Sequence, residues 1–140
     1  MPELWGHALA LVAAGVGAAA RLLLDGAISE WIARRPGRRG ALPWGTLAVN
    51  LSGALLIGLL AGATVGNLAD FSSGTPRADL SAAALGFLGG FTTFSTASVQ
   101  TVRLLRERRW ALAAANGVGQ WVATVGLVVL GWWLMASILG

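Results

Sequence analysis

The sequence predicts an all-α membrane protein with four transmembrane helices, and its composition and hydropathy pattern carry this prediction. Hydrophobic residues make up 56% of the 140 residues and the mean hydropathy is +0.70, whereas soluble proteins are about 45–50% apolar. A bilayer core about 30 Å thick is crossed by a helix of roughly 20 apolar residues. Runs of sufficient length with almost no charge cover residues 4–20, 40–69, 80–102 and 110–140. We expect them to form one domain over residues 1–140.

The first two helices are expected at residues 4–24 and 42–66, where Pro43 suits a first helical turn. No basic residue precedes the first apolar run and further apolar runs follow, so we interpret it as a retained helix, not a secretion signal. The second helix carries a stripe of glycines at i, i+4 and i+8: Gly58, Gly62 and Gly66. This stripe either lets another helix approach closely or reflects the abundance of glycine in membrane helices.

The third and fourth helices are expected at residues 80–105 and 110–138, the fourth being longer than a bilayer requires. The centre of the third helix reads GGFTTFSTAS over residues 89–98. Two adjacent glycines followed by two β-branched threonines form a weak helix centre, because glycine costs about 1 kcal/mol relative to alanine. We therefore expect the third helix to be broken here, with freed carbonyls that face protein or a cavity and could bind a cation.

Charge predicts the orientation in the membrane. All ten basic residues are arginines; eight lie in the first and third connections, while Arg77 is the only one in the second. This bias places the arginine-rich connections in the cytoplasm and both termini outside. Most tryptophans lie near the expected helix ends, at headgroup depth: Trp5, Trp31, Trp44, Trp110, Trp132 and Trp133. The arginine pattern is that of a membrane protein, so no nucleic-acid partner is expected.

The polar residues inside the cores of the last three expected helices are neutral. No Asp, Glu or Lys lies within the cores of the last three helices, which disfavours a proton-coupled exporter, since such an exporter needs a carboxylate at membrane depth. Cysteine is absent and there is a single histidine, so we expect no enzyme. In the fourth helix, Asn116, Gln120 and Thr124 form a stripe at i, i+4 and i+8. The stripe could join helices through hydrogen bonds or line a wet path.

The hydroxyl cluster after the expected break also has two interpretations. Ser and Thr could bond back to the carbonyl four residues earlier and bend the helix. Alternatively, hydroxyl donors and the positive edge of the Phe94 ring could replace part of the water shell of an anion. Five hydroxyls around a glycine pair favour the second interpretation.

Three strings, GVGAAARLLL (15–24), GTLAVNLSG (45–53) and GFLGGFTTFST (86–96), resemble the Fluc/CrcB family of fluoride channels in order and spacing. The resemblance covers nearly the whole chain. It implies a fluoride-specific channel in the cell membrane that passively exports fluoride and lowers its toxic cytoplasmic concentration. It also implies an antiparallel, dual-topology-type dimer with two pores and a structural, non-transported sodium ion (Na+) at its centre.

The resemblance also implies roles for particular residues. It assigns the sodium ligands to the backbone carbonyls of Gly89 and Thr92. It assigns the fluoride pore to Asn50, Thr93, Phe94, Ser95, Thr96 and Ser98. The second pore phenylalanine of the family falls at Ala97, where this chain departs from the pattern.

The arginine bias bears on the dimer. A chain that pairs with itself in antiparallel fashion inserts in both orientations and needs nearly balanced charge, whereas this chain is strongly biased. We therefore expect an antiparallel heterodimer with an oppositely oriented related chain, a homodimer being the alternative. Two other functions stay open: a small proton-coupled multidrug-type exporter and a non-conducting membrane scaffold.

Overall fold

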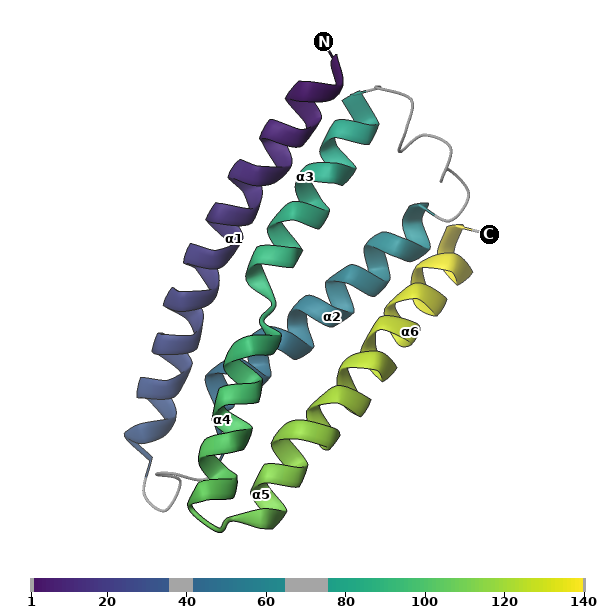
Figure 1. The fold of residues 1–140 in the computed structure, drawn as a ribbon. Helices are drawn as coiled ribbons and strands as arrows, with labels where there is room; N and C mark the ends of the chain where they lie inside the picture. Colours follow the sequence, from purple (N-terminus) through teal and green to yellow (C-terminus); the bar gives the residue numbers. More distant parts are fainter. Residues whose placement is uncertain (1, 36–41, 65–75, 140) are drawn as a thin grey trace.

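A computed structural model describes residues 2–35, 42–64 and 76–139, and this part of the chain is helical without strands (Figure 1). Its elements are α1 (Pro2–Ala33), α2 (Trp44–Thr64), α3 (Pro76–Phe91), α4 (Phe94–Arg106), α5 (Trp110–Ala114), the π-helical turn η2 (Ala115–Gly119) and α6 (Gln120–Leu139). Within these residues, four spans are long and apolar enough to cross a membrane: Leu4–Ala33, Trp44–Thr64, Leu80–Arg106 and Trp110–Leu139. The predicted all-α class with four such helices is confirmed.

Helix α1 packs along α3 through glycines (Figure 1). A Cβ atom added to Gly17 would collide with the carbonyl oxygen of Phe87. From the other side, Cβ atoms added to Gly86 and Gly90 would collide with carbonyl oxygens of α1. Small residues let two helix backbones approach closely in lipid, where van der Waals contact drives association. The glycines therefore hold α1 against α3.

Helix α2 packs along α6 in the same way. A Cβ atom on Gly58 would collide with the carbonyl of Val128, and one on Gly62 would lie 2.5 Å from the carbonyl oxygen of Trp132. The close-approach interpretation of the glycine stripe is confirmed at these two positions. Gly66 lies outside the described residues.

Two glycines of α1 provide a matched pair for testing this packing. We expect Gly17→Ala to destabilise the protein by about 1–3 kcal/mol, because the added methyl group enters a fully packed contact. A Cβ atom added to Gly15 would have no neighbouring atom within 4 Å, so Gly15→Ala should be neutral or stabilise by up to about 1 kcal/mol. Thermal unfolding of both variants in the same detergent measures the difference. Equal unfolding temperatures would contradict the packing role of Gly17.

The expected end of the first helix at Leu24 is wrong, because α1 continues to Ala33. Asp25 and Glu30 end the apolar run, and the expected boundary rests on the absence of charge. A helical backbone does not require apolar side chains, however, and Ser29 donates to Asp25 one turn earlier at 3.2 Å. The sequence reaches Pro36 shortly afterwards, and a residue before proline is disfavoured in a helix. The expected fourth helix, residues 110–138, corresponds to α5, η2 and α6, so it contains a π-helical turn that the sequence does not predict.

Helix α2 places polar side chains at the centre of the bundle. Its buried residues include Val49 and Ala54, with Thr46 and Asn50 on the same helix at 1% and 6% exposure. Many large apolar side chains elsewhere are exposed, as Leu11 and Leu23 on α1 are. This distribution suits a protein whose outer surface meets lipid.

Candidate functional site

The site is built around the junction of α3 and α4. Helix α3 ends at Phe91, α4 begins at Phe94, and Thr92 and Thr93 lie outside both helices. Thr93 has an extended backbone, with φ −145° and ψ 118°, and serves as the N-cap of α4. Its hydroxyl group accepts from the Thr96 amide at 3.3 Å and donates its hydrogen to the Thr96 hydroxyl oxygen at 3.1 Å. A threonine cap of this kind satisfies an amide that has no partner within its helix.

Asn50 of α2 holds the junction through both ends of its side-chain amide. Its Oδ1 accepts from the Thr93 amide at 2.8 Å, and its Nδ2 donates to the Thr93 carbonyl at 2.9 Å. The Thr93 amide thus bonds to a side chain and not to the Gly89 carbonyl, its partner in an uninterrupted helix. Because Asn50 is buried, the two bonds satisfy a backbone unit that water reaches poorly.

Thr92 and Phe91 fasten the end of α3. The amide and the hydroxyl of Thr92 both donate to the Leu88 carbonyl, at 2.9 and 3.0 Å. The methyl group of Thr92 packs where a side chain on Gly53 would lie. Phe91 is buried and stacks on Phe87, with ring centroids 5.7 Å apart. Phe91 is therefore a packing residue, in contrast to Phe94, which is 82% exposed.

A cavity of about 650 Å³ opens beside the junction, between α2, α4, η2 and α6. It brings together most of the polar residues singled out in the sequence: Asn50, Thr92, Thr93, Ser98, Asn116, Gln120 and Thr124. Phe94 and Ala97 also line it. Ser95 and Thr96, both expected in the pore, and Gly89 do not belong to its lining. The polar stripe of the fourth helix thus faces the same space as the hydroxyls of α4.

Two hydroxyls in the cavity are bonded to their own helices. Ser98 donates to the Phe94 carbonyl at 2.9 Å, and Thr124 donates to the Gln120 carbonyl at 2.7 Å. This is the pattern in which a hydroxyl bonds back one helical turn. A hydroxyl rotates about its C–O bond, and a typical hydrogen bond contributes only about 0.5–1.5 kcal/mol net. The same groups can therefore turn their donors toward an anion in the cavity at small cost.

Asn116 links the π-helical turn to α4. Its Nδ2 donates to the Ala97 carbonyl at 3.1 Å and to the Thr101 hydroxyl oxygen at 2.9 Å, and the side chain is 2% exposed. Within the described part of the chain, Asn116 Oδ1 and Gln120 Oε1 are buried without a hydrogen-bond partner. π-helical turns such as η2 are frequent at functional sites. Ala97, the position at which the resemblance leads one to expect phenylalanine, is buried under this contact.

A second polar network does not follow from the sequence pattern. Thr46 of α2 donates to the Asp25 carboxylate at 2.8 Å and accepts from the Gln100 amide at 2.9 Å. The network connects α1, α2 and α4. The sequence prediction places Asp25 in the connection after the first helix. It therefore gives no sign that Asp25 contacts α2. The available signal is Thr46 itself, which precedes Asn50 by one helical turn and therefore lies on the same face.

The four long apolar helices of the described residues define a small multi-pass membrane protein. A profile of the family described as "CrcB-like protein, Camphor Resistance (CrcB)" matches residues 8–132. The chain therefore belongs to the CrcB family, and the resemblance found in the sequence is confirmed.

Individual relatives agree with this assignment. "Fluoride-specific ion channel FluC 1" of Symbiobacterium thermophilum is 45% identical over 86% of this chain and 93% of its own length. The protein of the same name in Leifsonia xyli is 38% identical over 88% of this chain and 81% of its own length. "Fluoride-specific ion channel FluC" of Nitrobacter winogradskyi is 36% identical over 91% of this chain and 93% of its own length. The family is one of ion channels, so the prediction that the chain is not an enzyme is confirmed.

Proposed function

We propose that this protein is a fluoride-specific channel that exports fluoride passively and lowers its concentration in the cytoplasm. The observation that carries the proposal is the pair of hydrogen bonds from Asn50 to the Thr93 backbone between α3 and α4, beside a largely apolar cavity that several polar side chains line. The relatives named as fluoride-specific ion channels support the choice of ion.

The chemistry of the cavity suits a small, strongly hydrated anion. Asn50, Thr93, Phe94 and Ser98 offer amide, hydroxyl and aromatic-edge groups that can replace water around fluoride. The amides of the first turn of α4 add the positive end of a helix dipole at the same place. Fixed positive charge is absent from the described lining, so bound fluoride would not be trapped.

We further propose that Gly89 and Thr92 hold a structural sodium ion through their backbone carbonyls. Two features of the junction fit this role. The Thr93 amide does not bond to the Gly89 carbonyl, and the Thr92 carbonyl lies between the two helices. Unwound carbonyls at the end of a half-helix are suitable sodium ligands. A bound sodium ion would supply positive charge that holds the junctions of two chains together.

We propose an antiparallel dimer in the cell membrane, formed with a related chain of opposite orientation. In this arrangement both termini of the chain face outward and the arginine-rich connections face the cytoplasm. The charge bias supports a heterodimer, because a biased chain inserts in one direction. Purified and reconstituted alone, the chain should give little fluoride efflux, and efflux should appear when the partner chain is added. Robust efflux from the homodimer would contradict the heterodimer.

The transport mode distinguishes a channel from a proton-coupled exporter. Liposomes that contain the assembled channel should release fluoride down its own gradient at the same rate with and without an imposed proton gradient. The absence of an acidic side chain from the described cavity lining is the physical reason. A fluoride electrode measures the release, and protein-free liposomes correct for leakage of neutral HF. Transport that depends on the proton gradient would favour the exporter, and the absence of any release would favour a scaffold.

A further inference from the structure

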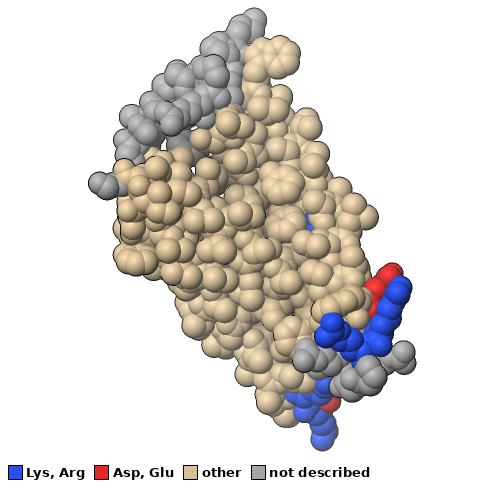
Figure 2. Space-filling view, turned by 180° about the vertical axis from the view of Figure 1, so that it is seen from behind, with Lys and Arg blue, Asp and Glu red and all other residues tan. Residues whose placement is uncertain are grey.

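One end of the bundle carries a concentrated positive surface, which we call the arginine end. Among the described residues it consists of Arg34, Arg35, Arg103, Arg106, Arg108 and Arg109. These residues lie where α1 ends and where α4 turns into α5 (Figure 1). Figure 2 shows their blue side chains gathered at this end, while the face above it is almost entirely uncharged. The acidic side chains described there are Glu30 and Glu107, so positive charge prevails.

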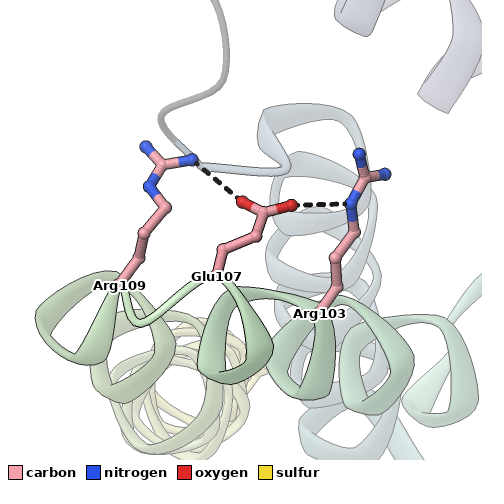
Figure 3. A network of polar contacts seen from close by, with 3 residues as sticks. All are labelled: Arg103, Glu107 and Arg109. Carbon is pink, nitrogen blue, oxygen red and sulfur yellow. Dashed lines mark hydrogen bonds and ion pairs between the residues drawn. The ribbon is translucent and has the colours of Figure 1, made fainter.

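Ion pairs and stacking hold several of these guanidinium groups in place. Glu107 accepts from Arg103 Nε at 3.1 Å and lies 3.6 Å from Arg109 Nη1, so one carboxylate is shared by two arginines (Figure 3). The Arg35 guanidinium stacks on the Trp31 ring, 3.7 Å from its centroid. A guanidinium carries five N–H donors. Each of these groups therefore keeps donors that the contacts above do not use.

The turn between α4 and α5 presents two more arginines. Arg108 has a left-handed backbone, with φ 58°, at the point where the chain reverses direction. The side chains of Arg106 and Arg108 are exposed and form no ion pair with any described residue. They are therefore the most available cations of the arginine end.

Two tryptophans set the depth of this surface in the membrane. Trp31 and Trp110 are 56% and 66% exposed, and each lies within a few residues of the arginines. Exposed tryptophan rings prefer the headgroup layer. The guanidinium groups beside them then lie at the level of lipid phosphates, which they can bind in a bidentate manner.

We propose that the arginine end binds the headgroups of anionic phospholipids. The charge, the free donors of Arg106 and Arg108 and the flanking tryptophans all match a phosphate at the membrane surface. A zwitterionic lipid offers the same phosphate together with a positive group, which the arginines repel. The inference does not depend on which ion the protein conducts.

The test is native mass spectrometry of the purified protein with phosphatidylglycerol or phosphatidylcholine. The wild-type protein should retain phosphatidylglycerol in preference, and the double variant Arg106→Gln, Arg108→Gln should retain it about tenfold less well. Arg77→Gln removes a charge from the start of α3, at the other end of the bundle, and should behave as the wild type does. Arg106→Lys, Arg108→Lys keeps the charge and should retain most of the binding.

Several results would overturn the proposal. They are equal retention of the two lipids by the wild type, unchanged retention by the double glutamine variant, and release of phosphatidylglycerol by an equal concentration of inorganic phosphate. Preferred binding of an RNA oligonucleotide over the lipid would also overturn it. Circular dichroism checks that each variant is folded, and raised salt should weaken lipid retention by the wild type if charge drives it.

Discussion

Replacement of Asn50 by alanine is expected to reduce fluoride efflux by at least about tenfold. The variant loses both bonds to Thr93 and leaves its part-buried amide and carbonyl without these partners, each at a cost of about 1 kcal/mol. A cost of 1.36 kcal/mol in a barrier corresponds to about a tenfold change in rate. The α3–α4 junction should then lose the fixed backbone geometry that these two bonds give it. Fluoride-electrode recordings on liposomes measure the loss.

The matched control for this variant is Ser52→Ala, on the same helix. Ser52 is exposed and its hydroxyl donates to the Val49 carbonyl of its own helix at 3.1 Å. Its removal should leave efflux unchanged. Hydrogen exchange adds a readout of the junction itself: the Thr93 amide should exchange faster in Asn50→Ala and at the wild-type rate in Ser52→Ala. Protected Thr93 in Asn50→Ala would contradict the role assigned to Asn50.

Replacement of Phe94 by alanine is expected to reduce fluoride efflux strongly without unfolding the chain. Phe94 lines the cavity and is 82% exposed, so its loss should change the free energy of unfolding by less than about 0.5 kcal/mol. Contacts to an aromatic edge contribute about 0.5–1.5 kcal/mol, the upper value corresponding to about tenfold in rate. The expected loss of efflux in Phe94→Ala is therefore up to about tenfold.

Two further variants separate the ring edge from simple bulk. Phe94→Leu keeps an apolar side chain for packing or for contact with a partner chain, yet lacks the positive ring edge, so efflux should remain low. Recovery of efflux in Phe94→Leu would show a packing role instead. Phe91→Ala removes a buried ring that stacks on Phe87 and should lower the free energy of unfolding by about 3–5 kcal/mol. Thermal unfolding in detergent distinguishes the two phenylalanines.

The sequence is sufficient to predict features that depend on local composition. Apolar runs locate the four membrane helices, since a helix in lipid must be apolar over its whole crossing. The glycines at positions 58 and 62 offer a face for close helix approach, and the structure shows that α6 packs on it. Gly89 and Gly90 with two threonines mark the weak centre of the third helix, and the structure leaves Thr92 and Thr93 outside α3 and α4.

Features that depend on distant partners could not be predicted. The family resemblance marks Asn50 as a pore residue. Its two bonds to Thr93, however, join residues 43 positions apart, and the spacing of residues in the sequence does not reveal such a pairing. The link from Thr46 to Asp25 is hidden because the expected first helix ends at Leu24, just before Asp25. The π-helical turn at Ala115–Gly119 depends on where Asn116 finds acceptors on α4, which is also a tertiary effect.

The most direct test of the central claim is the efflux of fluoride and chloride from the same liposomes. Liposomes with the assembled wild-type channel, and those with Ser52→Ala, should release fluoride and retain chloride. Liposomes with folded Asn50→Ala protein should retain both ions. Equal release of chloride by the wild type would contradict fluoride selectivity. Undiminished fluoride release by folded Asn50→Ala would contradict a pathway held open at the α3–α4 junction.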